Sequence, residues 1–325
     1  MCRMKTSLKI FIGIIAFFII FLICDIAFFY YTYYKQTNVF SSQKKYIQDS
    51  DEKKPIPKYF IKLTKFKDEY DYINFRPIQN PDSNENPVLI FGCSYAYGYL
   101  FDNSETISFV MSKYSARPII NRASNGWSIQ HMLYQLKNDK EYFSSIKPPK
   151  YVFYVLMDNI GHFERIYLTS FPSVLENNYY LKYKLKNGKL VENKPLFNLY
   201  YNFAIFRHIQ NKLMSKHVQN AFDKGNPELF DLFILHCEEI NDLIKERWGN
   251  DTKFIILTFE NTKKELWAPQ LEKMGIDVID IAQTIGYKDL QNSQYGFFEP
   301  EICGHPNGKI WELLLPKLKE KYPDL

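Results

Sequence analysis

The chain has 325 residues, 46% of them hydrophobic and 24% charged, which is the composition of a folded protein and excludes wholesale disorder. Lys and Arg number 41 against 36 Asp and Glu, and this small excess is spread along the chain, which argues against a nucleic-acid-binding face. The five cysteines contain no CxxC pair, so a zinc ribbon and a thioredoxin-type redox site are excluded.

Near the N-terminus, residues 10–24 form an uncharged apolar run, IFIGIIAFFIIFLIC. Together with its flanks, the segment Leu8 to Tyr31 is long enough to cross a hydrocarbon core of about 30 Å as a helix. Tyrosines at 30, 31, 33 and 34 are typical of the aromatic belt at a membrane interface. Asp25 lies near the outer end, where it can reach that interface. Residues 1–35 are therefore predicted to be a short tail and a transmembrane signal-anchor helix.

Basic residues on the two sides of this run predict its orientation. Arg3, Lys5 and Lys9 directly precede it, although the bias is imperfect because lysines also stand beyond the run at 35, 44 and 45. The positive-inside rule then places the N-terminus in the cytoplasm and the rest of the chain on the extracytoplasmic side, periplasmic or extracellular. A cleaved signal peptide fits less well, because the apolar run is too long and no A-x-A-like site follows it.

Residues 36–58 are polar and are predicted to be a juxtamembrane linker, and residues 59–325 are predicted to be one α/β domain. Short apolar runs bounded by turn residues predict five buried strands: Val88–Phe91, Pro118–Asn121, Tyr151–Met157, Phe254–Phe259 and Asp277–Ile281. Amphipathic patterns predict four helices: one capped by Ser104 and running to Lys113, one capped by Ser128, Pro227–Trp248 and Lys309–Lys319. This alternation favours a parallel sheet covered by helices on both faces.

An insertion at about 165–225 interrupts the alternation. Its segment YYLKYKLKNGKLVE places Asn187-Gly188 between alternating residues, which predicts a β-hairpin. The insertion either forms a wall of a substrate site or is a structural addition with no role in the site.

Two residues at opposite ends of this domain have the character of a nucleophile and its base. Ser94, in LIFGCSYAYGYL, follows the first strand at the entry to a helix, where its own N–H and the dipoles of the turn can stabilise an oxyanion. His305, in GHPNGKIWELLLPKL, lies in a polar loop before the last helix and is free to act as a general base. The structural alternatives are a helix-capping serine and a helix-capping histidine.

Two further segments supply donors for an oxyanion. In NRASNGWSIQ, Gly126 opens the next helix and lets a backbone N–H approach a ligand closely. In YVFYVLMDNIGHFER, Asp158 and Asn159 reach the C-terminal end of the third strand, where Asn159 can donate a side-chain N–H. Both segments follow strands, and open α/β sheets bind ligands at the carboxyl ends of their strands. An ordinary turn at Gly126 and an Asx turn at Asp158 and Asn159 remain the alternatives.

In this order, GCSYAYG, NRASNG, VLMDN and GHPNGK resemble the four sequence blocks of the SGNH (GDSL-type) hydrolase superfamily, over about residues 87–318. The resemblance implies a three-layer α/β/α sandwich with a mainly parallel sheet of about five strands, the flavodoxin-like SGNH fold. It also implies a nucleophile at Ser94, a base at His305, and an oxyanion site from Ser94, Gly126 and Asn159. It implies no metal and no organic cofactor.

The chain departs from the family pattern where the family carries aspartates. Cys93 stands in place of the first, and Ile302 and Cys303 occupy the positions before His305 where the second is expected. His305 therefore needs another orienting group, for which Glu299, Glu301 and a backbone carbonyl are the candidates. The third block also matches poorly, so either Asp158 or Asn159 can face the site.

Four more residues are candidates for lining the site in such a fold. Cys93 and Cys303 are expected near it, and outside the cytoplasm a disulfide between them is one option. His162 follows the third block and is interpreted as a surface-loop residue or, less simply, as a substrate contact. Trp127 either lines a pocket or packs in the core.

Three functions remain open from the sequence. The first is a membrane-anchored serine esterase that removes acyl groups, acetyl in the first instance, from an envelope glycan or a small ester through an acyl-serine intermediate. The second is an O-acyltransferase that passes the acyl group to an envelope polysaccharide. The third is a catalytically degenerate scaffold or glycan-binding protein, which the missing aspartate supports and the retained Ser94, Gly126 and His305 oppose.

Overall fold

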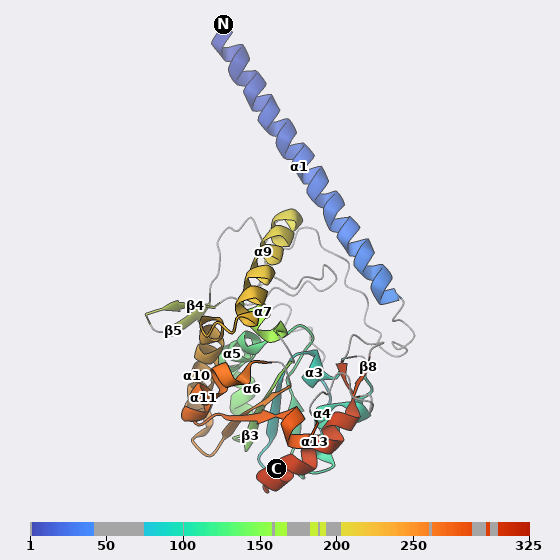
Figure 1. The fold of residues 1–325 in the computed structure, drawn as a ribbon, viewed down its shortest axis with the longest axis vertical. Coiled ribbons are helices and arrows are strands. Elements are labelled where there is room, and N and C mark those ends of the chain that lie inside the picture. Colours follow the sequence, from blue (N-terminus) through green and yellow to red (C-terminus); the bar gives the residue numbers. More distant parts are fainter. Residues whose placement is uncertain are drawn as a thin grey trace.

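The computed structural model describes residues 2–41, 75–99, 101–157, 160–167, 183–187, 189–192, 203–259, 262–287, 297–299 and 305–325 (Figure 1). Its helices are α1 Cys2–Ser41, α3 Ser94–Tyr97, α4 Ile107–Ser112, α5 Ile129–Asn138, α6 Lys140–Ser145, α7 Gly161–Tyr167, α9 Ala204–Asp223, α10 Glu228–Trp248, α11 Lys264–Lys273, α12 Ile281–Ile285 and α13 Gly308–Lys321, with the 3-10 turn η2 Asn103–Glu105. Its strands are β1 Val88–Gly92, β2 Ile119–Asn121, β3 Tyr151–Leu156, β4 Tyr183–Lys186, β5 Lys189–Glu192, β6 Lys253–Thr258, β7 Asp277–Asp280, β8 Phe298–Glu299 and β9 His305–Pro306.

The centre of the domain is a sheet of five parallel strands in the order β2-β1-β3-β6-β7. Numbered along the chain, this order is 2-1-3-4-5, which is the flavodoxin-like arrangement. The five strands coincide with the five predicted apolar runs to within one residue at each end. The predicted fold class is therefore confirmed, and the strand order reverses between β1 and β3.

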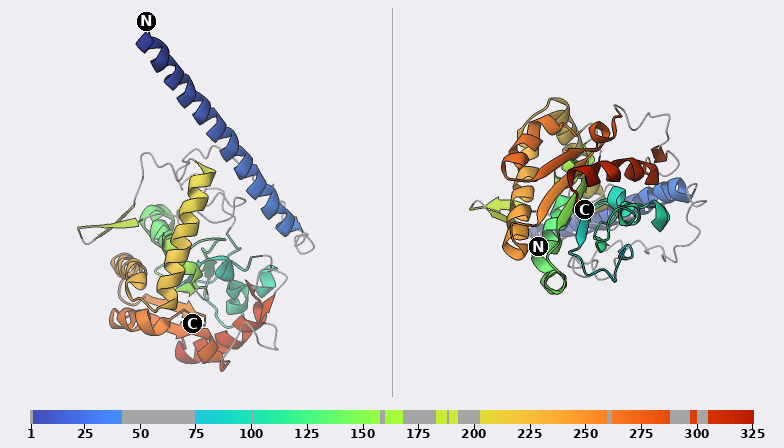
Figure 2. Two further views of the ribbon diagram at one scale, coloured as in Figure 1. Left: turned by 45° about the horizontal axis from the view of Figure 1, so that its top comes forward. Right: turned by 90° about the horizontal axis from the view of Figure 1, so that it is seen from below.

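Alternate residues of each strand enter two separate cores, one on each face of the sheet. Leu89, Val152 and Ile256 pack on one face beneath α5, α7, α10 and α11. Their neighbours Ile90, Phe153 and Leu257 pack on the other face beneath α4, α12 and α13. Both faces of these strands are buried, which explains why the sequence shows continuous apolar runs and no polar alternation. Figures 1 and 2 show the resulting three layers.

Most predicted helix starts agree with the structure, and one does not. Ser128 is the N-cap of α5, and Pro227 is the N-cap of α10. The prediction that Ser104 caps a helix is wrong, because Ser104 lies inside the turn η2. Thr106 caps α4 instead: it is extended, and its hydroxyl oxygen accepts a hydrogen bond from the Phe109 N–H at 3.3 Å.

The insertion contains the predicted hairpin and also a helix that the sequence analysis did not predict. Strands β4 and β5 pair antiparallel, with Asn187 at a φ of 54° in the turn between them. The 20-residue helix α9 follows. Residues 168–182 and 193–202 of the insertion lie outside the described residues.

Helix α1 is long and extends well beyond the domain (Figure 1). By length and composition, its segment Ile10–Phe28 can cross a membrane, with a mean hydropathy of 3.0 and only 6% of the segment buried. The helix continues to Ser41, six residues past the predicted end of the anchor segment. The rest of the predicted linker, residues 42–58, lies outside the described residues.

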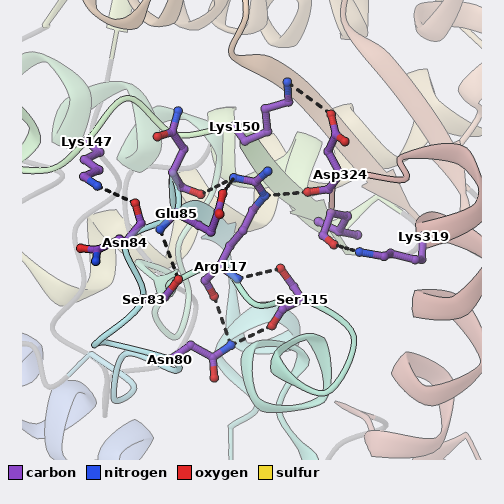
Figure 3. A network of polar contacts seen from close by, with 12 residues as sticks. Asn80, Ser83, Asn84, Glu85, Ser115, Arg117, Lys147, Lys150, Lys319 and Asp324 are labelled. Carbon is purple, nitrogen blue, oxygen red and sulfur yellow. Dashed lines mark hydrogen bonds and ion pairs between the residues drawn. The ribbon is translucent and has the colours of Figure 1, made fainter.

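A polar network closes the amino-terminal edge of the sheet (Figure 3). Arg117 donates to the backbone oxygens of Asp324 and Asn86 at 2.6 and 3.0 Å. Asn80 donates to the backbone oxygen of Ser115 at 2.8 Å. These contacts join the segments that lead into β1 and β2 to the C-terminus, so the carboxyl edge of the sheet is the one left for a site.

Candidate active site

The turn that carries Ser94 is fixed by close packing at Gly92. The φ of Gly92 is 146°, and a Cβ atom on this residue would lie 2.8 Å from the Val155 carbonyl oxygen and 3.0 Å from the Ala96 Cβ. Glycine is therefore required where β1 gives way to α3. Ser94 is the first residue of α3 and is 7% exposed.

Cys93 is the N-cap of α3 and is fully buried in the core. Its sulfur accepts a hydrogen bond from the Tyr95 N–H at 3.4 Å, which is the contact that a short acidic cap residue would make. The Cys93 thiol is free in the structure. Cys303, its suggested disulfide partner, lies outside the described residues.

The other end of α3 is held by Arg76, a residue that the sequence analysis missed. Its guanidinium donates to the backbone oxygens of Tyr97, Gly98 and Phe101 at 2.9, 2.6 and 3.0 Å. The last carbonyls of a helix have no partner within the helix, so a charged donor stabilises them. No local pattern marks Arg76, because its partners follow it by more than 20 residues.

Asn121, at the end of β2, joins α3 to the next loop. It is buried, and its side-chain amide donates to the Ala96 carbonyl oxygen at 2.8 Å. Its side-chain oxygen accepts from the Ala123 N–H at 3.0 Å. The loop between β2 and α5 is thereby held against the serine-bearing helix.

Gly126 lies in a tight turn within that loop. The Trp127 N–H donates to the Ser124 carbonyl oxygen at 3.3 Å, and Gly126 has a φ of 72°. A positive φ at the third position is what a type II turn requires. The Ser124 N–H in turn donates to the Gly92 carbonyl oxygen at 3.4 Å, so the turn lies against the end of β1. The structure thus brings the predicted Gly126 and Ser94 segments together.

Helix α7 supports this turn through a buried arginine. Arg165 donates to the Trp127 carbonyl oxygen at 3.0 Å, and its own carbonyl oxygen accepts from the Gln130 side chain at 2.9 Å. Trp127 is 3% exposed and stacks on His131 at 5.4 Å, which favours the packing interpretation of Trp127 over a pocket wall. Arg165 was not identified from the sequence, although it stands on the segment that follows the third block.

The prediction that His162 lies in a surface loop is wrong. It belongs to α7 and is 1% exposed, because this segment packs as a helix on the sheet. Its Nδ1 lies 2.8 Å from the Tyr154 hydroxyl. Burial, together with the nearby Arg165 and His131, lowers the pKa of His162 well below its usual value. Burial likewise lowers the pKa of His131 to about 3. Both imidazoles are therefore neutral parts of the core.

His305 approaches the serine-bearing turn from the C-terminal part of the chain. Its ring centroid lies 5.3 Å from that of Tyr95 and 5.9 Å from that of Tyr99. Tyr95 directly follows Ser94, and the Tyr99 N–H bonds to the Ser94 carbonyl oxygen at 3.1 Å. His305 therefore lies beside the first turn of α3.

The position of His305 is set by backbone contacts on both sides. Strand β9 pairs antiparallel with β8, with His305 directly opposite Glu299. The Asn307 N–H donates to the Phe297 carbonyl oxygen at 2.9 Å, and the Asn307 side chain caps α13 by accepting from the Lys309 N–H at 3.2 Å. Four other predicted site residues, namely Glu301, Cys303, Asp158 and Asn159, lie outside the described residues and stay predictions.

These elements meet at the carboxyl ends of β1 and β3, where the strand order reverses and where such sheets bind ligands. A serine at the start of a helix, a neighbouring histidine and a tight glycine turn form an arrangement suited to nucleophilic attack by the serine. Among the residues that the structure describes, no group of three or more His, Cys, Asp or Glu could hold a metal ion.

No protein-family model matches the chain, and no curated protein matches it by sequence. Solved structures are similar at low identity. A lipolytic protein of the G-D-S-L family from Veillonella parvula is 13% identical, with a TM-score of 0.38 over 74% of this chain and 100% of that one. A putative lipolytic protein of the same family from Desulfitobacterium hafniense is 13% identical, with a TM-score of 0.40 over 73% and 99%. A catalytic mutant of an acetylxylan esterase from Geobacillus stearothermophilus is 9% identical, with a TM-score of 0.39 over 72% and 93%.

Proposed function

We propose that this chain is a serine esterase of the SGNH type, anchored to a membrane by α1. It removes acyl groups, acetyl in the first instance, from an envelope glycan or a small ester on the extracytoplasmic side. The observation that carries the proposal is the meeting of His305 with the first turn of α3, which begins at Ser94, at the carboxyl edge of the sheet.

In this proposal, the Ser94 hydroxyl oxygen attacks the ester carbonyl carbon while His305 accepts the hydroxyl proton. The backbone N–H groups of Ser94 and Gly126 and the side chain of Asn159 stabilise the oxyanion that forms. The intermediate collapses to an acyl-serine, and the alcohol leaves with the proton from His305. Water then attacks the acyl-serine and loses a proton to His305. As the bond between the acyl carbon and the Ser94 oxygen breaks, His305 returns this proton to that oxygen, and the acid leaves.

The test is covalent labelling of the full chain with a fluorophosphonate probe, followed by mass spectrometry. We expect an adduct at Ser94 that disappears in Ser94→Ala, weakens strongly in His305→Ala, and persists in the matched control Ser104→Ala, whose serine is exposed on η2. A folded chain that takes no label would contradict the proposal and favour the non-catalytic scaffold. Addition of acetylated donors and glycan acceptors then separates hydrolysis from acyl transfer, because only transfer yields an acylated acceptor.

Among the candidates for the group that orients His305, we favour Glu299, whose backbone pairs with that of His305 in the β8–β9 ladder. We expect Glu299→Gln to lower kcat for a small acetyl ester by about 10²–10⁴-fold with little change in KM, because the imidazole loses its orienting carboxylate. Glu299→Asp should restore part of kcat. If Glu301→Gln has this effect instead, that carboxylate is the partner, and if neither variant changes kcat, a backbone carbonyl orients the ring.

The contacts of Arg76 predict an effect on activity that is separable from stability. Arg76→Met should cost about 2 kcal/mol of stability through its lost charge-assisted bonds. It should also lower kcat of the folded enzyme by about 10-fold to 100-fold, because the serine-bearing helix shifts. Arg117→Met is the matched control, since Arg117 also donates to backbone oxygens but at the opposite edge of the sheet. If the two variants have equal kcat, Arg76 has only a structural role.

A further inference from the structure

Helix α9 contacts the apolar part of α1. The Phe21 ring lies 5.2 Å from the Phe203 ring and 5.7 Å from the Phe206 ring, and the Phe28 ring lies 5.3 Å from the His208 ring. Phe21 and Phe28 both belong to the segment Ile10–Phe28 that can cross a membrane. At 1.5 Å per residue, Phe21 lies about 10 Å inside the end of that segment, so the start of α9 lies at this depth as well.

A carboxylate on the same face of α1 fixes the contact. Asp25 is fully buried, and its Oδ1 accepts a hydrogen bond from the Ile205 N–H at 2.8 Å. The N-cap position of α9 is occupied by Phe203, which has no side chain able to cap. Asp25 therefore caps α9 from another helix. A carboxylate within an apolar segment is costly unless it is paired, and the positive end of a helix favours it there.

The outer face of α9 continues this apolar surface. Ile209 and Leu213 are 47% and 66% exposed and lie one turn apart. Lys212 and Lys216 are exposed beside them. Lysines beside apolar residues at the end of a membrane-spanning segment can attract anionic headgroups. On α1, Phe17 and Ile20 are 65% and 61% exposed, so the same lipid would surround both helices.

We infer that the first half of α9, Ala204–Leu213, lies in the interface of the bilayer that α1 spans. Ile209, next to the His208 that contacts Phe28, faces lipid at the end of the apolar segment, and Leu213, Lys212 and Lys216 lie beyond that end among the lipid headgroups. The inference rests on the membrane anchor of the proposed function and adds a second membrane contact to it.

This second contact connects the bilayer to the candidate site. On α9, the Ser215 hydroxyl bonds to the Glu164 carboxylate of α7, and Arg165 of α7 bonds to the Trp127 carbonyl oxygen beside Gly126. The domain is thus held at a set depth and orientation, with the support of the Gly126 turn facing the membrane-bound helix. The substrate class that fits is an acylated molecule presented close to the membrane surface.

The test is photo-crosslinking of the full chain in liposomes of phosphatidylcholine and phosphatidylglycerol. A benzophenone amino acid replaces Leu213, or Phe17 in the middle of the anchor, or Gln219, an exposed residue near the other end of α9. We expect lipid adducts at 213 and 17 and none at 219. Lipid adducts at 17 but not at 213 overturn the inference and leave the anchor intact, whereas their absence at 17 contradicts the anchor itself. Adducts from 213 to protein, or lipid adducts at 219 equal to those at 213, also overturn it.

A second pair of variants tests the cap. With the probe at 213, Asp25→Asn keeps an acceptor for the Ile205 N–H and should keep the lipid adduct, whereas Asp25→Leu should lose it. Loss of the adduct in both variants supports a role for the charge. Retention in both shows that α9 reaches lipid without Asp25 and contradicts the capping step.

Discussion

Replacement of Ser94 by alanine is expected to lower kcat for a small acetyl ester by about 10⁴–10⁶-fold, because the acyl-serine cannot form. His305→Ala should cause a loss of the same order, since the hydroxyl then has no base. A nucleophile and its base act as one unit, so the double variant should be about as active as either single variant.

The double variant distinguishes a catalytic pair from two independent contributions. Steady-state hydrolysis of 4-nitrophenyl acetate gives kcat for all three variants. Ser94→Ala combined with Arg117→Met is the control. Arg117 lies at the opposite edge of the sheet, so the fold-losses in kcat of these two single variants should multiply in the double variant. Multiplicative losses in the Ser94–His305 pair would mean that His305 acts on some other step.

Mild acid is expected to unfold the α/β domain. Burial lowers the pKa of His131 to about 3 and of His236 to about 4, and it lowers the pKa of His162 well below the usual value. In the unfolded chain the pKa of each imidazole returns to about 6.5. Between these values the unfolded state binds protons that the folded state excludes, so stability is full above pH 6.5 and falls as the pH drops. For each pH unit below 6.5, His131 and His236 should each lower the free energy of unfolding by about 1.4 kcal/mol. His162 should lower it as well.

The measurement is urea unfolding followed by tryptophan fluorescence at pH 7.5, 6.5 and 5.5. His236→Gln should flatten the pH dependence, since it removes one buried titrating group whose Nδ1 lies 2.6 Å from the Leu232 carbonyl oxygen. Gln219→Ala, a substitution of an exposed residue of α9 that does not titrate, should leave the dependence unchanged. A stability that does not vary between pH 7.5 and 5.5 would show that these imidazoles are solvated in the folded protein.

The buried histidines also affect how an activity profile is interpreted. Groups with pKa values of about 3 and 4 stay neutral throughout the range in which a histidine base titrates. A change in kcat/KM between pH 5 and 8 that occurs without unfolding would therefore not come from His131 or His236.

Contacts between residues close in sequence were determined by the sequence alone. The five strands agree with their apolar runs because both faces of the sheet are buried, and every residue of β3 is therefore apolar or aromatic. The hairpin at Asn187 was predictable because a positive φ in a two-residue turn has few acceptable side chains. Ser94 and Gly126 were identified because each follows a strand, which places it at the carboxyl edge of any parallel sheet.

The tertiary structure alone decided which distant segments meet. No local pattern reveals that Arg76 binds the end of α3, that Glu299 stands opposite His305, or that α9 is capped by Asp25 of α1. His162 was misplaced for the same reason: its segment has loop-like polarity, and only packing against β3 makes it a buried helix. Hydrogen bonds and burial between segments depend on the whole arrangement of the sheet and its helices, whereas turn chemistry and apolar periodicity act within a few residues.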